Sequence, residues 1–257
     1  MCAGISTALH PVVAVVQTRM TSSRLPGKVL KPLAGAPLIR RMIERVLRVE
    51  GIDAVVVALA EGAAHDAVIP VLGDLDVEIV RGSENDVLAR SAAAARFANA
   101  ATVMRLTSDC PAIDPAVSAS VLAAYATGRQ AGIRYARTAF ETGFPHGFDT
   151  EVFAADALYE ADGAATDPYE REHVTPYIWR RPEQFPAIVL DTRPDRRAWR
   201  LVVDTEDDYR LMSAIYDALF PRHPDFGFAD ICALFAARPD LPSINAHVGA
   251  PSYVGLG

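Results

Sequence analysis

Four short runs of apolar, mostly β-branched residues recur in the first half of the chain. They cover residues 12–17 (VVAVVQ), 54–60 (AVVVALA), 77–80 (VEIV) and 101–107 (ATVMRLT). Most positions in these runs are apolar, rather than every second one, which is typical of parallel strands that are covered on both faces. We therefore predict four buried strands of one mostly parallel sheet.

Segments with a helical pattern separate these strands, at residues 36–51, 83–100 and 114–128. The first has an apolar stripe at helical spacing, Pro37 at the first helical position and Gly51 as its stop. Ser83 and Asp114 are the expected N-caps of the other two. This alternation predicts an α/β fold with right-handed βαβ units and a doubly wound sheet. In such sheets, ligands bind beyond the carboxyl ends of the strands.

The regular alternation ends after about residue 130. Residues 131–137 and 144–153 have the pattern of strands around a Gly/Pro turn, and residues 166–181 that of a helix interrupted or stopped at Pro176. We interpret residues of about 134–192 as a small inserted α+β subdomain.

The α/β pattern then returns. Residues 198–204 (AWRLVVD) are predicted to form a strand, and residues 205–220 a helix with Thr205 as its N-cap. Residues 12–220 are thus expected to form one domain that includes the inserted subdomain. Residues 221–257 are expected to form a C-terminal helical extension and a tail.

The composition of the 257-residue chain is that of a globular protein with an acidic balance. Its residues are 51% hydrophobic and 22% charged, which suits a large core in an α/β domain. A formal net charge of -7 and a pI near 5.4 disfavour nucleic acids and anionic membranes as partners, because both attract broad basic surfaces. We therefore expect a small-molecule ligand, no nucleic-acid partner and no membrane partner.

Cysteine usage and the N-terminal sequence bear on the compartment. Cys2, Cys110 and Cys232 are widely separated and form no C-x-x-C pair, so neither a zinc knuckle nor a disulfide framework is expected. No Lys or Arg precedes Arg19, and the longest apolar run before it, VVAVV, is far too short for a signal sequence or a membrane span. These features favour a cytoplasmic protein.

A basic segment follows the first predicted strand. Residues 17–31 (QTRMTSSRLPGKVLK) carry Arg19, Arg24, Lys28 and Lys31 and no acidic residue. Cations, small hydroxyl side chains and backbone N–H groups on one short loop form a cradle for phosphates. The fingerprints G-x-G-x-x-G and G-x-x-x-x-G-K-[ST] are absent, which disfavours a dehydrogenase or a P-loop kinase. A solvated basic loop is the alternative, but the place after the first strand favours phosphate binding.

Two aspartates come at the ends of predicted strands. Asp109 follows the run 101–107, and Asp204 ends the run 198–204. Two carboxylates at one sheet edge can hold Mg²⁺ against a polyphosphate, because Mg²⁺ takes one or two protein carboxylates and completes its shell with water and phosphate oxygens. Either aspartate is alternatively a helix cap, which is the role we expect for Asp114.

Six motifs between about residues 12 and 220 together resemble one enzyme superfamily. They are QTRMTSSRLPGKVLKPLAG, RGSENDVLAR, RLTSDCPAIDP, FPHGFDTEVF, EREHVTPYIW and LVVDTEDDYRL, in this order. The chain resembles the cytidylyltransferases that activate acidic sugars, such as the acylneuraminate and 3-deoxy-manno-octulosonate (KDO) cytidylyltransferases. Within that superfamily it is most similar to the spore-coat-polysaccharide (SpsF-like) branch.

The resemblance implies a GT-A-like fold, that of the nucleotide-diphospho-sugar transferases, and a reaction in which CMP passes from CTP to an acidic acceptor with release of pyrophosphate. It implies that Arg19, Arg24 and Lys28 bind the triphosphate. Arg24, Lys28 and Asp109 are then the catalytic residues, and Asp109 and Asp204 bind Mg²⁺.

The resemblance also suggests roles for residues outside the basic loop. Arg81, Ser83 and Arg105 fall where related enzymes contact the cytosine or the ribose. The acceptor-side candidates are His146, Asp149, Glu172 and His173. They lie in the inserted part, which in such enzymes shapes the acceptor pocket and the homodimer contact. The other histidines, His65 among them, lie in polar or Pro-rich contexts and are expected at the surface.

Two other classes of function remain open at this point. A GT-A-type glycosyltransferase would use a nucleotide-sugar, but such enzymes usually carry D-x-D where this chain has SDCP. A non-catalytic nucleotide-binding subunit would usually have lost the carboxylates or the cations of the loop. The products separate the three: pyrophosphate for a cytidylyltransferase, a nucleoside diphosphate for a glycosyltransferase, and neither for a binding subunit.

Overall fold

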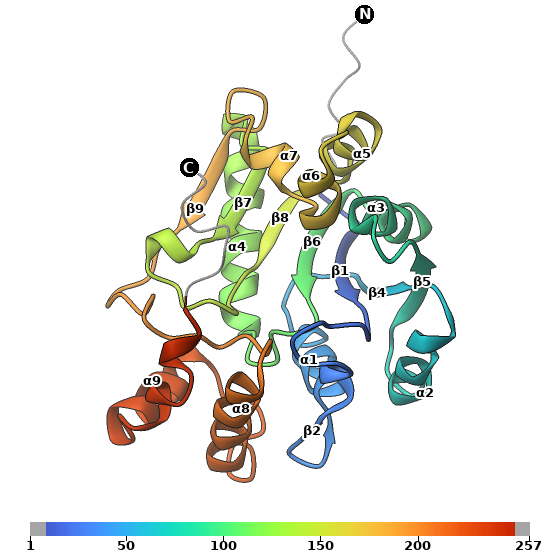
Figure 1. The fold of residues 1–257 in the computed structure, drawn as a ribbon. Helices are drawn as coiled ribbons and strands as arrows, with labels where there is room; N and C mark the ends of the chain where they lie inside the picture. The colour runs from blue at the N-terminus through green and yellow to red at the C-terminus, as the bar shows by residue number, and fades with distance from the viewer. Residues whose placement is uncertain (1–8, 250–257) are drawn as a thin grey trace, which may run out of the picture.

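The computed structural model describes residues 9–249, and a seven-stranded sheet forms the centre of this part of the chain (Figure 1). The strands are β1 (Val12–Thr18), β4 (Ala54–Ala60), β5 (Glu78–Gly82), β6 (Thr102–Thr107), β7 (Tyr135–Thr138), β8 (Glu151–Ala154) and β9 (Ala187–Leu190). Their order in the sheet is β5-β4-β1-β6-β8-β7-β9. Of the seven strands of this sheet, only β8 runs antiparallel to its neighbours. The expected α/β fold with a mostly parallel sheet is confirmed.

The four strands predicted from apolar runs are β1, β4, β5 and β6. The prediction that all four are buried is wrong for β5, which is an edge strand without a buried residue. The burial of β1 shows why the runs are continuous: Val12 to Val16 are all fully buried. Val12, Ala14 and Val16 belong to one core cluster, and Val13 and Val15 to another on the opposite face. Because successive side chains point to opposite faces, a strand covered on both sides needs apolar residues throughout.

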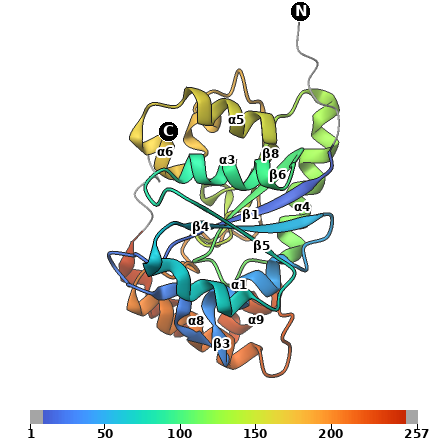
Figure 2. The same ribbon diagram turned by 90° about the vertical axis from the view of Figure 1, so that its right-hand side faces the viewer.

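Helices cover both faces of the sheet. The helices are α1 (Leu38–Val46), α2 (Ile69–Leu72), α3 (Val87–Phe97), α4 (Pro115–Gly128), α5 (Ala155–Ala164), α6 (Pro168–His173), α7 (Pro176–Trp179), α8 (Glu206–Leu219) and α9 (Phe228–Ala237). Side chains of α1 and α4 join one core cluster, and those of α3, α5 and α7 the other. Figure 2 shows α3 and α5 above the strands and α1 below them. Within residues 9–249, no helix is both long and apolar enough to cross a membrane.

The ends of the helices match the expected caps in part. Asp114 caps α4 by accepting hydrogen bonds from the backbone N–H groups of Ala116 and Val117, as predicted. Asp86, rather than Ser83, caps α3, because its carboxylate accepts from the N–H of Ala89. The hydroxyl of Ser83 accepts from the N–H of Asp86 and so supports the turn that leads into the helix.

Two prolines mark helix starts. Pro37 is the N-cap of α1 and ends the two-residue strand β3 (Ala36–Pro37), which pairs with β2 (Pro32–Leu33), so it precedes the first helical residue instead of occupying it. Pro176 begins α7, and α6 ends at His173 before Val174, whose φ is +73°. The predicted interruption of this helical segment is therefore confirmed.

The predicted strand at residues 198–204 is wrong. This segment forms no strand. Its β-type backbone pairing is limited to one isolated bridge between Arg200 and His146. Both edges of β6 are already occupied, by β1 and β8. The N–H of Val203 instead donates to the carbonyl of Asp109 in the loop beyond β6, at 2.8 Å. The apolar alternation is real, because Leu201 and Val203 are fully buried in a third core cluster with α8 and α9.

The second half of the chain extends the sheet. Residues 134–192 contribute β7, β8 and β9 to the same sheet as β1. In Figure 1, α8 and α9 lie side by side, and they share the third core cluster. Residues 221–249 thus include the helical part of the predicted extension, whereas residues 250–257 lie outside the described residues. The proposed roles of the 134–192 segment stay predictions.

Candidate active site

Lys28 brings the two predicted metal-binding aspartates together. Its Nζ lies 2.8 Å from an Oδ of Asp109 and 2.8 Å from an Oδ of Asp204. The two carboxylates are therefore no further apart than twice that distance, although they come from distant parts of the sequence. The Lys28 side chain is only 10% exposed, so the ammonium is largely removed from solvent. Lys28, Asp109 and Asp204 form one charged cluster at the carboxyl end of β6, which we call the carboxylate cluster.

A tight loop places Lys28 in this cluster. The N–H of Gly27 donates to the carbonyl of Met20 at 3.0 Å, and Gly27 has a φ of +68°. A residue with a Cβ is strained in that left-handed conformation, so the Pro-Gly sequence suits the turn. Lys28 then begins a short 3-10 turn, Lys28–Leu30, and its side chain points back toward the end of β6.

The charges in the cluster stabilise one another. Burial by itself favours the neutral form of Asp109, but the Lys28 ammonium holds the pKa of that carboxyl well below its usual range. Burial likewise disfavours the charged form of Lys28, yet the carboxylates of Asp109 and Asp204 raise its pKa overall. At neutral pH Lys28 is therefore an ammonium and Asp109 a carboxylate.

The donor set of this cluster fits Mg²⁺. Two carboxylates on one cation are the number that Mg²⁺ takes from protein, with phosphate oxygens and water completing its shell. Within residues 9–249 there is no group of three or more His, Cys, Asp or Glu arranged to hold a metal alone. A metal here would therefore take its remaining ligands from water or from the phosphates of a substrate. It would take the oxygens that Lys28 now contacts and leave the ammonium to contact phosphate.

Arg200 is a member of the site that the sequence reasoning missed. Its guanidinium contacts the carboxylates of Asp204 and Asp208, at 2.8 and 2.9 Å, and lies 2.9 Å from Nδ1 of His146. Arg24 contacts the same oxygen of Asp204 at 2.9 Å. The spacing of four residues from Arg200 to Asp204 and from Asp204 to Asp208 was the available signal. Arg200 thus orients Asp204 from the side opposite Lys28.

Replacing Asp208 by asparagine is expected to destabilise the protein by about 2–4 kcal/mol at neutral pH, because it leaves Arg200 with an incomplete set of partners. The side chain of Asp208 is fully buried. Although burial opposes its ionisation, Arg200 lowers the pKa of Asp208 below its usual value. The stabilisation is therefore present above about pH 4, the unfolded-state pKa, and is lost as the pH falls through the lower folded-state pKa.

Urea unfolding of wild type and Asp208→Asn at several pH values measures this effect. Asp207→Asn, which changes the neighbouring residue of the same helical turn, is the matched control and should be nearly neutral. A difference that grows toward low pH would contradict the assignment.

A hollow of about 460 Å³ brings together predicted residues from three motifs. It is lined by Arg19, Ser83, Asn85, Asp86, Thr166, Pro168, Arg171 and Glu172. Arg19 follows β1 directly, Ser83 follows β5, and Glu172 belongs to α6. Arg171 lies between the carboxylates of Asp86 and Asp162, at 2.6 and 3.0 Å, and so joins α6 to the start of α3. All of these lining residues except Pro168 are polar or charged, and polar groups are what fixes the orientation of a ligand in a pocket.

Two other predicted nucleotide contacts are engaged within the protein. Arg81 forms an ion pair with Asp66 and does not line the hollow. Arg105 forms an ion pair with Glu151, and its Nη2 donates to the side chain of Gln17 at 2.9 Å. Their roles toward a nucleotide stay predictions.

The acceptor-side candidates are divided between two places. His146 adjoins Arg200, and burial lowers the pKa of its imidazole. The carboxylate of Asp149 accepts a hydrogen bond from the N–H of Gly147 at 3.1 Å. Glu172 lines the hollow, and the ring of His173 lies 4.3 Å from that of Tyr169. His146 thus lies beside the carboxylate cluster, which it reaches through Arg200, whereas Glu172 lines the hollow with Arg19.

His65 was expected at the surface and is buried instead, with 1% of its area exposed. Its Nδ1 accepts a hydrogen bond from the N–H of Met20 at 3.0 Å, and its Nε2 lies 3.4 Å from a carboxylate oxygen of Glu84. His65 therefore supports the basic loop between Arg19 and Gly27. Its polar sequence context contains no signal for this contact with a loop 45 residues away.

Comparisons with known proteins agree with this geometry. A family model described as Cytidylyltransferase matches residues 13–221. The chain is 29% identical to the spore coat polysaccharide biosynthesis protein SpsF of Bacillus subtilis, over 90% of this chain and 97% of that protein. It is 34% identical to a 3-deoxy-manno-octulosonate cytidylyltransferase of Anaeromyxobacter sp. strain K, over 72% of this chain and 77% of that enzyme.

A solved structure has the same fold over nearly the whole chain. A cytidylyltransferase from Leptospira borgpetersenii serovar Hardjo-bovis superposes with a TM-score of 0.85 at 29% identity, and the match covers 90% of this chain and 96% of that one. The family match covers most of the chain, including the basic loop and both aspartates of the carboxylate cluster. The chain belongs to the cytidylyltransferase family of nucleotidyltransferases.

Proposed function

We propose that the protein transfers CMP from CTP to a small acidic sugar or a related small acid, releases pyrophosphate and depends on Mg²⁺. The observation that carries this proposal is the placement of Lys28 between Asp109 and Asp204. A cation-binding pair of carboxylates beside a basic loop is the arrangement that phosphoryl and nucleotidyl transfer require, since most of the catalysis is charge neutralisation and positioning.

In the proposed reaction, an oxygen of the acceptor attacks the α-phosphorus of CTP. The bond from that phosphorus to the oxygen shared with the β-phosphate breaks, and pyrophosphate leaves with the electron pair. The proton of the acceptor hydroxyl passes to water. Positioning the acceptor opposite the leaving group replaces an encounter in solution and lowers the barrier.

The residues of the cluster have distinct proposed roles. Arg24 and Lys28 neutralise the departing pyrophosphate, and Asp109 and Asp204 hold Mg²⁺. When bound, the metal supplies positive charge at the phosphate oxygens. Arg200 holds the Asp204 carboxylate in place through their 2.8 Å contact. His146, which contacts Arg200, lies on the acceptor side of this arrangement.

The hollow that contains Arg19 is proposed to hold the rest of the substrates. Arg19 and Ser83 contact the nucleotide, and Glu172, with the adjacent His173, faces the acceptor. Arg81, Arg105 and Asp149 complete the proposed set near the ends of the strands. An acidic acceptor is supported by the similarity to an enzyme named for 3-deoxy-manno-octulosonate.

We further propose that the protein acts as a homodimer through the segment 134–192. This segment includes β9, which is an edge strand of the sheet, and Val189 on it is 38% exposed. The unpaired backbone N–H and C=O groups of an edge strand can pair with another chain, which supports this proposal.

A thermal-unfolding panel with CTP, UTP, ATP and GTP, each with and without Mg²⁺, tests the nucleotide and the metal. A ligand at about one hundred times its dissociation constant adds about 2.7 kcal/mol, which raises the midpoint of a chain of this size by roughly 5–10 °C. We expect that shift with CTP and Mg²⁺ together and a much smaller one with the other nucleotides. Pyrophosphate release is then measured with acidic sugars as acceptors.

Two outcomes would contradict the proposed function. If no triphosphate shifted the midpoint but a nucleotide-sugar did, and a nucleoside diphosphate were released, the protein would be a glycosyltransferase. If CTP bound but no acidic acceptor led to pyrophosphate release, it would be a nucleotide-binding subunit.

A further inference from the structure

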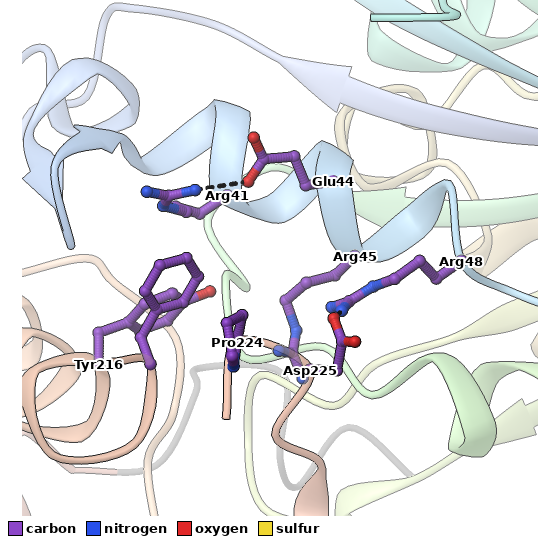
Figure 3. Close-up of a pocket in the computed structure, with 8 residues that line it drawn as sticks. Arg41, Glu44, Arg45, Arg48, Tyr216, Pro224 and Asp225 are labelled. Carbon is purple, nitrogen blue, oxygen red and sulfur yellow. Dashed lines mark hydrogen bonds and ion pairs between the residues drawn. The ribbon is translucent and has the colours of Figure 1, made fainter. Parts of the chain in front are cut away.

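A second hollow, of about 240 Å³, lies between α1 and the end of α8. Its lining residues are Arg41, Glu44, Arg45, Arg48, Tyr216, Phe220, Pro224 and Asp225. Arg41 and Arg45 belong to α1, and Arg48 follows its end. All three extend toward Tyr216, Pro224 and Asp225 (Figure 3). The spacing of four residues places Arg41 and Arg45 on one face of the helix. None of these residues belongs to the carboxylate cluster or to the hollow with Arg19.

Arg45 is a buried cation without a counter-ion. It is 2% exposed, and no carboxylate within residues 9–249 lies at ion-pair distance from it. Its Nε donates to the carbonyl of Ile113 at 2.6 Å and its Nη2 to the carbonyl of Phe226 at 2.8 Å. Its Nη1 is buried and has no hydrogen-bond partner among the described residues. A buried charge in this state is unfavourable unless an anion pairs with it.

Another arginine shows that burial alone does not leave a nitrogen unpaired. Arg90 is also 2% exposed and donates to three backbone carbonyls, those of Ala58, Ser83 and Glu84. None of its nitrogens is both buried and without a partner in the described part of the chain. Among the described residues, Nη1 of Arg45 and Nε of Arg196 are the side-chain nitrogens that are buried and have no hydrogen-bond partner. Of these two arginines, Arg45 is the one that lines the second hollow.

The carboxylates of the hollow do not neutralise the positive charge of Arg45, because each is paired with another arginine. Arg41 contacts Glu44 at 2.8 Å, and Arg48 forms an ion pair with Asp225. Three guanidinium groups thus face two carboxylates, which leaves one positive charge in excess. Asp225 is 71% exposed, so its contact with Arg48 is easily exchanged for another anion.

Aromatic rings form one wall of the hollow. The rings of Tyr216 and Phe220 are stacked with centroids 5.9 Å apart, and the Arg41 guanidinium lies 4.2 Å from the centre of the Phe220 ring. Flat apolar walls beside cations suit a ligand with a compact body and an anionic group. A guanidinium group binds phosphate through two parallel hydrogen bonds, so the arginines of the hollow favour a phosphate as this anionic group.

We propose that this hollow binds a small phosphorylated molecule, with its phosphate on Arg45 and Arg48 and its body against Tyr216 and Phe220. The site lies behind the loop that carries Asp109. Arg45 holds the carbonyl of Ile113 in that loop, and the hydroxyl of Tyr216 donates to the carbonyl of Pro111 at 2.6 Å. This binding does not depend on the proposed transfer of CMP.

Binding of radiolabelled ribose 5-phosphate and of inorganic phosphate to the full chain, measured by equilibrium dialysis, tests the proposal. Arg48→Glu is expected to weaken binding of ribose 5-phosphate at least tenfold, and Arg48→Gln, which keeps the length without the charge, to weaken it as well. Arg238→Glu, which changes an arginine paired with Asp240 on the far end of α9, should leave binding within about twofold of wild type. Thermal unfolding verifies that each variant is folded.

The comparison of the two probes and one further variant completes the test. Tighter binding of ribose 5-phosphate than of phosphate supports a ligand with an organic body, and equal binding supports recognition of the phosphate group alone. Arg24→Ala weakens any binding of the probes at the carboxylate cluster, and the binding that Arg48→Glu removes should remain in this variant. The proposal is overturned if neither probe binds up to about 10 mM, or if Arg48→Glu binds ribose 5-phosphate as tightly as wild type.

Discussion

An Asp109→Asn variant is expected to release pyrophosphate from CTP at least about 100-fold more slowly than the wild-type protein. Asparagine keeps the shape of the side chain but removes the charge that holds a divalent cation against the phosphates. Lys28 retains its second partner, Asp204, at 2.8 Å, so the fold should survive. The measurement is steady-state release of pyrophosphate as a function of Mg²⁺ concentration, together with the thermal midpoint.

The Mg²⁺ dependence of the residual activity and the thermal midpoint together distinguish a role of Asp109 in metal binding from a role in folding. If Asp109 holds the metal, the variant should need much more Mg²⁺ for its residual activity, whereas its midpoint should change little. Asp191→Asn, which removes an exposed carboxylate on the loop after β9, is the control and should be fully active. Near-normal release by Asp109→Asn at low Mg²⁺ would remove Asp109 from the catalytic machinery.

A Lys28→Met variant is expected to lose at least about 100-fold in turnover and up to about 3 kcal/mol in the free energy of unfolding at neutral pH. Methionine has nearly the same volume but leaves Asp109 and Asp204 facing each other without the ammonium between them. Two like charges at this distance raise each other's pKa. The stability of the variant relative to wild type should therefore improve as the pH falls toward about 4, where the carboxylates take up protons.

Divalent metal gives a second readout for Lys28→Met. A cation between the two carboxylates replaces the missing ammonium, so Mg²⁺ should raise the midpoint of the variant more than that of wild type. Lys31→Met, which removes an exposed partner of Glu206 from the same segment, is the control for stability and should cost less than about 1 kcal/mol. If Mg²⁺ had the same effect on both proteins, the two aspartates would not form a metal site.

Much of the arrangement was predictable from local pattern. The apolar runs predicted β1, β4, β5 and β6. For β1, β4 and β6 the reason is that strands buried on both faces need apolar residues at nearly every position, whereas β5 is an edge strand. The basic loop and the two aspartates were predicted from residue type and from their place after strands. The segment 198–204 had the same apolar signal and is not a strand, since no free edge of β6 was left for it.

The contacts that depend on distant residues were not predictable in the same way. His65 supports the loop after β1, and Arg200 connects Asp204 to Asp208 and His146. Nothing in the neighbouring sequence of His65 indicates its partner. The packing of the helices decides which distant segments lie close together, and this determines the partner of a polar side chain.

Periodicity and residue type alone were enough to predict β1, β4, β5 and β6 and the helices α1, α3 and α4, because these elements follow from interactions between near neighbours in the chain. They also made residues 17–31 candidates for phosphate binding and two aspartates candidate metal ligands. The packing of distant segments decided that Lys28 lies between Asp109 and Asp204, and that Arg45 is buried without a counter-ion. Charge interactions act through space over a few ångströms. Their strength is therefore determined only when the core has placed the groups and removed the water between them.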